Sequence, residues 1–297
     1  MKDESTPFTL GICAYNEAMN IGRAIESVYE QELKGFELIE TIVVSSGSTD
    51  GTDDIVNGLK ATHNSIRLIR QEKREGKNSA INRFFEEKKT PIVVMMNADT
   101  LFHDKESLQK LLEPLKDENI GIVGGHPLPT NDRKTIAGFA SHMVWLMHHH
   151  VSLINPQIGE IIAFRDIGTK LSTIHSGDEG SIKMELEKAG YKSVYVPEAM
   201  VLNRGPETIS DFLKQRTRVN IGERIIKTEH DYDFPSWSFR NLFRAYVETM
   251  KELGFHPIKM IAATMMEMYS RVKAYLHVKI NKQDIGCWEP IKTTKKI

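Results

Sequence analysis

The sequence predicts an α/β protein in which helices flank a mainly parallel central sheet and a helical appendage follows on the C-terminal side. Three observations predict this class. Between residues 8 and 123, apolar runs typical of buried strands alternate with helical patterns, and such alternation favours right-handed crossovers between parallel strands. Polar loops follow these runs. From residue 258 onward, apolar residues recur at helical spacing.

The expected elements follow from these patterns in order. Helical spacing is clear where apolar residues recur from Ile21 to Val28. A polar turn over residues 45–52 leads into the next helix, with Thr49 or Asp50 as its cap. The expected strands cover residues 8–14, 38–44, 66–69, 92–96 and 120–123. The expected helices cover residues 20–31, a segment after residue 52, and residues 76–85.

The run of residues 92–96 ends in Asn97-Ala98-Asp99, and this stretch carries much of the functional information. Five apolar residues after a proline are typical of a strand buried on both faces of a sheet. The carboxyl end of such a strand lies at the ligand crevice of open α/β sheets. An unpaired buried carboxylate costs several kcal/mol. Asp99 is therefore either an oxygen ligand of a hard cation such as Mg²⁺ or Mn²⁺, or a cap for a helix opening at Asp104. The stretch alone leaves both roles open.

Polar loops also follow the first two expected strands. Residues 15–17 and 45–50 are such loops, and the carboxyl ends of parallel strands meet at one edge of a sheet, so both should face the crevice of Asp99. Neither a P-loop motif nor a G-x-G-x-x-G follows the first strand. Ordinary turn chemistry also accounts for each loop taken singly, since Gly47 and Gly51 suit turns. Together the loops indicate a nucleotide site that is not a P-loop.

Composition bounds the class of protein. The chain has 297 residues, 40% of them hydrophobic and 27% charged, an ordinary balance for a soluble globular protein. Its net charge of −1 gives no overall field that would attract nucleic acid. The N-terminus lacks the apolar core of a signal peptide, and no apolar run approaches the roughly 20 residues of a spanning helix. We therefore expect a cytoplasmic protein. Only two cysteines occur, Cys13 and Cys287, which argues against a disulfide framework.

Charge is unevenly distributed along the chain. From Arg240 onward there are 11 Lys/Arg and 5 Asp/Glu, whereas the preceding part has 28 and 35. A basic amphipathic helix of this kind can lie on an anionic membrane surface, peripheral to the cytoplasmic face. Alternatively, its apolar stripe packs on the rest of the chain or on a second copy, giving a homodimer. The stripe consists of Ile258, Ile261, Met265, Met268, Val272 and Leu276.

Four motifs, taken in order, resemble those of family-2 glycosyltransferases of the GT-A (Rossmann-like) fold. They are residues 14–17, 45–52, 76–82 and 97–99, and later motifs extend the resemblance to about residue 225. The resemblance implies a nucleotide-diphosphate sugar donor (UDP- or GDP-linked), a divalent cation (Mg²⁺ or Mn²⁺) held by Asp99, and transfer with inversion at the anomeric carbon. The acceptor stays open between a lipid-linked group, a glycan end and a small polyol.

The resemblance also implies which residues bind the donor. They are Ala14, Tyr15, Asn16, Glu17, Ser45, Ser46, Lys77, Asn97, Ala98, Asp99, Arg165, Gln215 and Arg218. Ser45 stands where such enzymes often have an Asp that holds the nucleotide base, and Asn97 stands at the first position of a common Asp-x-Asp metal motif. Asn97 could offer a carbonyl oxygen or bond the ribose. Asn203 replaces a frequent His, and Val219 replaces a Trp that is often seen in processive polymer synthases, so a single transfer is favoured.

Asp178 and Glu179 are the candidates for the catalytic base. They precede an expected helix, where two acidic residues also suit the macrodipole without any catalytic role. The resemblance implies an acidic pair at this distance before Gly190, with Glu179 at the position of the usual base. Either carboxylate could serve, and we favour Glu179. Inverting transfer needs such a group to accept the proton of the attacking hydroxyl.

We therefore expect residues 1–228 to form a nucleotide-sugar-binding catalytic domain and residues 229–297 to form an amphipathic helical region. Two other functions stay open. A sugar-phosphate nucleotidyltransferase would also need a metal and a nucleotide crevice, but its usual glycine-rich basic loop after the first strand is missing. A catalytically silent nucleotide-sugar-binding protein would agree with the departures at Ser45 and Asn97.

Overall fold

The structure is a computed structural model that describes residues 5–173, 177–281 and 291–295. Cys287 and residues 1–4, on which two expectations rested, lie outside the described residues. The strands are β1 Thr6–Ala14, β2 Phe36–Ser46, β3 Ile66–Gln71, β4 Ile92–Asn97, β5 Thr100–Phe102, β6 Ile120–Pro129, β7 Ile161–Arg165 and β8 Lys192–Asn203. The α-helices are α1 Ile21–Tyr29, α2 Thr52–Leu59, α3 Lys77–Glu87, α4 Ser107–Leu112, α5 Ile136–Ser152, α6 Asp178–Lys188, α7 Ile209–His230, α8 Phe239–Leu253 and α9 Pro257–Asn281. Three short 3₁₀ helices are η1 Glu113–Lys116, η2 Pro235–Trp237 and η3 Lys292–Thr294.

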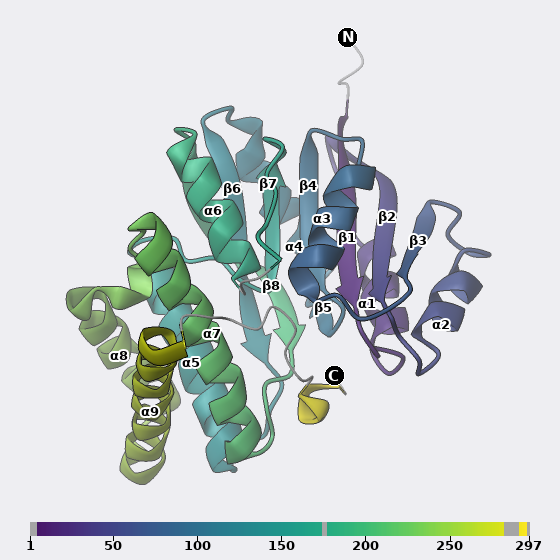
Figure 1. Ribbon diagram of the computed structural model, residues 1–297. Coiled ribbons are helices and arrows are strands. Elements are labelled where there is room, and N and C mark those ends of the chain that lie inside the picture. Colours follow the sequence, from purple (N-terminus) through teal and green to yellow (C-terminus); the bar gives the residue numbers. More distant parts are fainter. Residues whose placement is uncertain (1–4, 174–176, 282–290, 296–297) are drawn as a thin grey trace.

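The strands form one sheet in the order β3-β2-β1-β4-β7-β6-β8-β5 (Figure 1). β1 pairs in parallel with β2 and β4, and β2 pairs in parallel with β3, as predicted. The other half is mixed, because β7 lies antiparallel between β4 and β6, and β5 lies antiparallel to β8. β7 therefore starts at the edge where β4 ends. This edge collects the carboxyl ends of β1, β2 and β4.

β4 is buried on both faces, as its unbroken apolar run predicts. Ile92, Val94 and Met96 belong to one hydrophobic cluster, and Val93 and Met95 to another. The first cluster also contains the buried faces of α1 and α4, and the second those of α3 and α6. The sheet is thus covered by helices on both faces. Asp99 does not cap α4, which begins eight residues later.

The C-terminal helices pack on the side of the molecule that carries α5 and α7 (Figure 1). One apolar cluster joins Phe139 of α5, Phe212 of α7, Leu253 of α8 and Met260 of α9. A partly buried ion pair adds to this contact, since the Arg216 guanidinium on α7 donates to the Glu267 carboxylate on α9 at 2.8 Å. The expected helical appendage is therefore present and attached to the body through α5 and α7.

The predicted apolar stripe of α9 faces solvent instead of this cluster. Ile258 is 81% exposed and Met265 is 65% exposed, and the other four members of the stripe are exposed as well. Met260, Ala263 and Met266 form the face that packs on the body. The interpretation in which the stripe packs on the rest of the chain is therefore wrong. Among the described helices, none has the length and apolar content needed to cross a membrane.

Candidate active site

Two polar loops interlock at the crevice edge of the sheet. The backbone N–H of Asn16 donates to Ser48 Oγ at 3.1 Å, and the N–H of Thr49 donates to Asn16 Oδ1 at 2.8 Å. The N–H of Glu17 donates to Thr52 Oγ1 at 2.8 Å. Asn16 has a φ of 52°, a left-handed conformation that Asn tolerates better than most residues. The loop after β1 and the loop after β2 thus form one wall, as their placement at a common edge predicts.

Ser45 and Ser46 shape this wall from inside. The Ser45 hydroxyl is fully buried and donates to Ser48 Oγ at 2.9 Å. The Ser46 hydroxyl is also buried and accepts a hydrogen bond from the N–H of Glu75 at 3.1 Å. Both hydroxyls are therefore engaged within the protein. In this arrangement the two serines hold the loops rather than face the crevice.

Tyr15 presents an aromatic ring beside a guanidinium group. The centre of the Arg74 guanidinium lies 4.3 Å from the centroid of the Tyr15 ring, within the range of a cation–π interaction. Ala14, at the end of β1, and Ala98, next to Asp99, are both buried. Small buried residues at these positions bring the backbone close to the crevice.

Three carboxylates share the crevice: Glu17, Asp99 and Glu160. Burial raises the pKa of Asp99, and the charges of Lys295 and Lys77 only partly oppose this. Burial, and then the charge of Asp99, raise the pKa of Glu17 to about 7. The same two causes raise the pKa of Glu160 above its ordinary value. The raised pKa values of these acids therefore reflect burial first, and the charge of Asp99 adds to the effect at Glu17 and Glu160.

Lys295 brings an ammonium group to this cluster from the far end of the sequence. Its Nζ forms an ion pair with the Glu17 carboxylate and donates to the carbonyl oxygen of Tyr15 at 3.0 Å. The segment is anchored where the Thr293 hydroxyl donates to the Asp211 carboxylate at 2.8 Å. A cation thus already sits against the carboxylates of the crevice.

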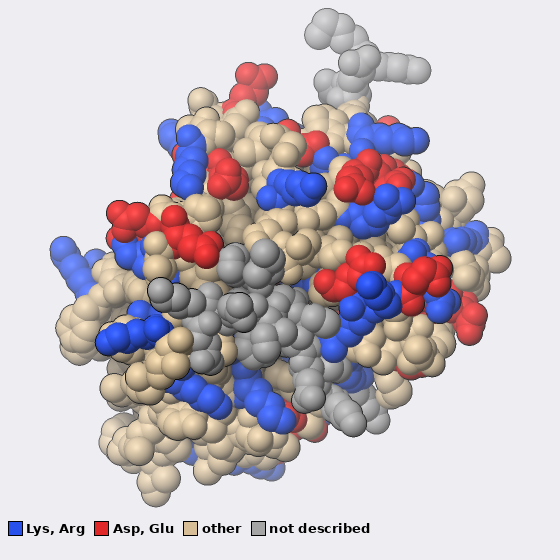
Figure 2. Space-filling model, in the orientation of Figure 1, with Lys and Arg blue, Asp and Glu red and all other residues tan. Residues whose placement is uncertain are grey.

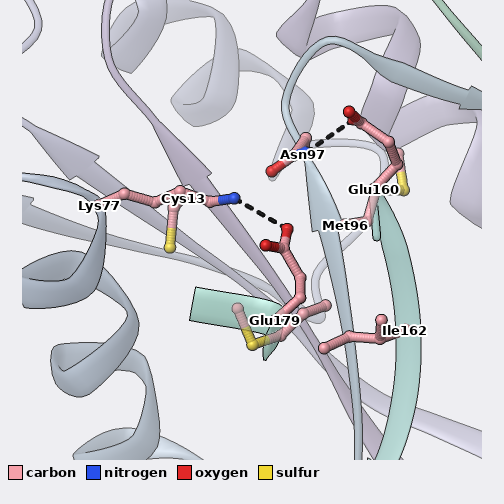
Figure 3. A pocket seen from close by; sticks show the side chains of 8 residues that line it. Cys13, Lys77, Met96, Asn97, Glu160, Ile162 and Glu179 are labelled. Carbon is pink, nitrogen blue, oxygen red and sulfur yellow. Dashed lines mark hydrogen bonds and ion pairs between the residues drawn. The ribbon is translucent and has the colours of Figure 1, made fainter. Parts of the chain in front are cut away.

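The acidic pair at the start of α6 lies across the crevice from β4 and is joined to α3 by Lys77. The Lys77 ammonium forms ion pairs with Asp178 and with Glu179, the latter at 3.1 Å. Figure 3 shows Lys77 and Glu179 pointing toward each other in a pocket that Asn97 and Glu160 also line. The predicted donor-binding Lys77 is therefore held between the two candidate bases.

The members of the acidic pair have opposite pKa shifts. Burial, and then the charge of Asp178, raise the pKa of Glu179 to about 8. Burial also disfavours the charged form of Asp178, but the Lys77 ammonium outweighs it and lowers the pKa of Asp178 to about 2. One carboxylate is thus permanently charged and the other can exchange a proton near neutral pH.

Helix α7 borders the crevice through Arg218. The Arg218 charge acts on Asp99, where it opposes the raised pKa. Gln215 lies one turn earlier on α7 and is half-buried, without a hydrogen bond to the described part of the chain. Spacing by three places both residues on one helix face. Arg216 between them points to α9, where it pairs with Glu267.

Arg165 is not brought to the crevice, and its predicted donor-binding role is wrong. Because β7 is antiparallel to β4, Arg165 pairs with Ile92 at the opposite end of β4. The six residues from Ile92 to Asn97 span roughly 16 Å of extended strand, because five steps of about 3.3 Å separate the first from the last. The Arg165 guanidinium donates there to three backbone carbonyls, those of Leu115, Asp117 and Ile120. It ties the sheet to the η1 turn.

The crevice offers the oxygen-rich donor set that a hard divalent cation needs. Carboxylates line it, and the Lys295 ammonium occupies a place beside Glu17 that a metal cation could take. The buried Oδ1 of Asn203 has no hydrogen-bond partner among the described residues. Asn203 pairs with Thr100, the residue after Asp99. In the described part of the chain, no three His, Cys, Asp or Glu side chains could hold a metal by themselves. Proteins often bind Mg²⁺ or Mn²⁺ through one or two carboxylates together with substrate phosphates and water.

Three crevice residues carry no motif that singles them out in the sequence: Arg74, Glu160 and Lys295. Glu160 directly precedes β7, so recognising β7 as antiparallel would place it at the crevice edge. Arg74 and Lys295 reach the crevice through contacts between segments that are distant in sequence. Such contacts leave no local pattern.

Comparisons with known proteins agree with this architecture. A family model described as Glycosyl transferase family 2 matches residues 9–175. The poly-beta-1,6-N-acetyl-D-glucosamine synthase of Staphylococcus aureus (strain COL) is 27% identical over 233 residues, which cover 73% of this chain and 54% of the relative. The corresponding synthase of Staphylococcus epidermidis is 26% identical over 220 residues, 70% of this chain and 52% of the relative. The chain spans about half the length of the curated relatives it matches.

Solved structures share the fold. The mannosyltransferase PcManGT from Pyrobaculum calidifontis, in complex with GDP-Man and Mn²⁺, superposes with a TM-score of 0.65 at 20% identity, covering 93% of this chain and 87% of that one. S. aureus TarS 1-349 in complex with UDP-GlcNAc gives a TM-score of 0.54 at 12% identity, covering 93% and 92%. These neighbours show the GT-A fold. Because the family model covers more than half of the chain and this fold accompanies it, the chain belongs to glycosyl transferase family 2.

Proposed function

We propose that this protein is an inverting glycosyltransferase that moves a sugar from a nucleotide-diphosphate sugar to an acceptor hydroxyl or phosphate. The observation that carries the proposal is the convergence of three groups at one edge of the sheet. They are the interlocked loops after β1 and β2, Asp99 after β4, and the acidic pair that opens α6. The nucleotide sugars bound by the two structural neighbours support a donor of the same class, UDP- or GDP-linked.

The donor's diphosphate would lie between Asp99 and Arg218. Asp99 would hold the divalent cation, and Arg218 would add a second positive group on the side of α7. When bound, the cation would neutralise the negative charge that develops on the leaving nucleoside diphosphate. The Tyr15 ring and the loop of residues 45–50 would border the nucleoside.

Glu179 would accept the proton of the acceptor hydroxyl as that oxygen attacks the anomeric carbon. Its pKa of about 8 makes it a stronger base than an ordinary carboxylate. Asp178, with a pKa of about 2, would stay charged and hold Lys77 in place. The base would therefore be the member of the pair that can both take and release a proton at neutral pH.

A donor screen tests this function directly. With Mn²⁺ present, we expect the protein to release free nucleoside diphosphate from a UDP- or GDP-linked sugar, slowly with water and faster with a suitable acceptor. Chelation of the cation with EDTA should stop the release. Release of nucleoside diphosphate is measured by coupled assay, with each sugar nucleotide in turn. Pyrophosphate formed from a sugar phosphate and a nucleoside triphosphate would instead establish a nucleotidyltransferase, and donor binding without release would establish a silent binding protein.

We further propose that residues 1–228 bind donor and acceptor and that residues 229–297 hold the enzyme at the cytoplasmic face of an anionic membrane with a lipid-linked acceptor. The apolar stripe of α9 is exposed, as are Phe239 and Phe243 on α8. Exposed basic side chains flank them, including Arg240, Lys273 and Lys279. In Figure 2, blue side chains are set into a largely tan surface over α8 and α9. Apolar area with a basic border matches the chemistry of an anionic lipid surface.

Vesicle sedimentation tests the membrane surface. The protein should pellet with vesicles that contain phosphatidylserine, and less so as salt rises, because each Lys or Arg near such a surface contributes about 1 kcal/mol that salt screens. Changing Ile258, Met265 and Val272 together to serine should abolish pelleting.

A matched control changes three other exposed apolar residues, Met19, Ile39 and Leu153, to serine and should pellet normally. A stripe variant that still pellets would contradict the proposal. So would a parent protein that ignores vesicles and forms a dimer, detected by analytical ultracentrifugation, that the same stripe variant abolishes.

A further inference from the structure

Glu160 and Asn97 form a two-point contact at the start of β7. The Asn97 side-chain amide donates from Nδ2 to Glu160 Oε2 at 2.8 Å, and the Asn97 backbone N–H donates to the Glu160 carbonyl oxygen at 3.4 Å. Asn97 ends β4, two residues before Asp99, and Glu160 comes from the chain segment that enters the antiparallel strand. A residue from a distant segment thus controls the side chain next to the predicted metal ligand.

This contact fixes the orientation of the Asn97 amide. Because Nδ2 is taken by Glu160, Oδ1 must point the other way. Figure 3 shows the Asn97 oxygen directed away from Glu160. An amide carbonyl is a good ligand for a hard cation. One of the two N–H groups of the Asn97 amide is thus committed to Glu160.

The contact also adds charge to the crevice. The Glu160 carboxylate brings a second acidic group to the pocket that Asn97 lines, and Asn97 stands two residues before Asp99. Asn97 itself is neutral and bonds to Glu160. Two carboxylates near an amide carbonyl oxygen should bind a divalent cation more tightly than a single carboxylate with water would.

The backbone conformation of Glu160 is unfavourable for a residue with a side chain. Glu160 has a φ of 61°, a left-handed conformation that costs a residue with a Cβ and is adopted easily by glycine. Strained residues of this kind persist where the surrounding structure holds them, often at functional sites. A glycine at position 160 would adopt this φ without strain, as a residue with a Cβ does not.

We infer that Glu160 is the positioning residue of the cation site: it holds Asn97 so that Oδ1 becomes a ligand beside Asp99, and it supplies the second negative charge of the site. The inference rests on the proposed use of a cation and makes the site one of two protein oxygens, Asn97 Oδ1 and an Asp99 carboxylate oxygen. Glu160 itself does not touch the cation. Glu160 thus carries the negative charge, and Asn97 provides the oxygen that would contact the cation.

A charge-relocation experiment tests this inference through cation binding rather than catalysis. Mn²⁺ affinity is measured by electron paramagnetic resonance of free Mn²⁺, with UDP or GDP present. Glu160→Gln removes the carboxylate charge while the glutamine oxygen can still accept from Asn97, and it should weaken Mn²⁺ binding by about 10- to 100-fold, the usual effect of altering a partner that orients a metal ligand. The double variant Asn97→Asp with Glu160→Gln returns the negative charge at residue 97 and should recover the parent affinity. Glu106→Gln, a surface carboxylate paired only with Lys110 among the described residues, is the matched control.

A glycine variant separates positioning from folding. Glu160→Gly should bind Mn²⁺ as poorly as Glu160→Gln, while its thermal unfolding temperature stays equal to or above that of the parent, because the left-handed backbone is relaxed. The inference is overturned if Asp99→Ala loses Mn²⁺ and Glu160→Gln does not, or if the double variant fails to recover binding. The experiment uses no sugar donor, so the Mn²⁺ affinities can be interpreted even if the protein does not transfer a sugar.

Discussion

Asp99→Ala is expected to remove cation-dependent binding of nucleoside diphosphate, with at least a hundredfold loss of affinity in the presence of Mn²⁺. The reason is that Asp99 lies where the charges of Glu17, Glu160, Arg218 and Lys295 all act, so it is the carboxylate at the centre of the crevice. Removal of a partner that merely orients a ligand already costs about 10- to 100-fold in metal affinity. Removal of the ligand itself should cost no less.

Isothermal titration with UDP and with GDP, each with and without Mn²⁺, measures the effect of Asp99→Ala. Asp166→Asn is a suitable control, because Asp166 lies just after β7 at the opposite edge of the sheet, where it pairs with Lys88. Burial raises the pKa of Asp99, so its charged form disfavours folding at neutral pH. Without cation, Asp99→Ala should therefore unfold at the same or a higher temperature than the parent. Retention of the parent's Mn²⁺-dependent affinity would remove Asp99 from the site.

Glu179→Gln is expected to keep donor and cation binding while transfer falls by about 10²- to 10⁴-fold, the usual contribution of a general base. Glutamine preserves the size of the side chain and its contact distance to Lys77 but cannot accept a proton. Transfer is measured under single-turnover conditions, and donor binding is measured separately by titration. If Glu179→Gln transfers normally and Asp178→Asn does not, then Asp178 is the base.

The pH profile gives the same assignment independently. A base works in its deprotonated form, so with a pKa of about 8 for Glu179 the rate should rise with pH and level off above about 8. Asp178→Asn removes a neighbouring negative charge that helps to raise the pKa of Glu179. The profile of Asp178→Asn should therefore move to lower pH while transfer persists. A profile that does not move would show that the rise belongs to another group.

The local part of the fold could be predicted because its signals are short in range. The unbroken apolar run of β4 required burial on both faces, and the polar loops after β1 and β2 required a common edge because both strands are parallel to their neighbours. These two facts place Asp99, Asn16 and Glu17 together. The exposed stripe of α9 was likewise visible as helical periodicity, although periodicity alone could not tell which face would be buried.

The direction of β7 could not be predicted in the same way. The sequence pattern of a buried apolar strand is the same whether the strand runs parallel or antiparallel to its neighbours. The helix α5 that precedes it is compatible with either direction. The resemblance assigned Arg165 to the donor site without giving a direction for its strand, so Arg165 was placed at the wrong edge and Glu160 went unnoticed at the right one. The contributions of Arg74 and Lys295 depend on tertiary contacts alone.

The ion pair between Lys295 and Glu17 joins residues 278 positions apart, and this separation has a consequence for the order of assembly. Closing a chain loop costs entropy that grows only as the logarithm of its length, about 0.6 kcal/mol for each doubling, so the large sequence separation adds little to the free-energy cost of the ion pair. The timing is different. During synthesis, β1 to β4 can pair among themselves long before residue 295 exists, and until then Glu17 and Asp99 repel each other without that ammonium. The parallel strands β1 to β4 can therefore pair early, whereas the ion pair at their ligand-binding edge forms only when the two distant segments of the chain meet.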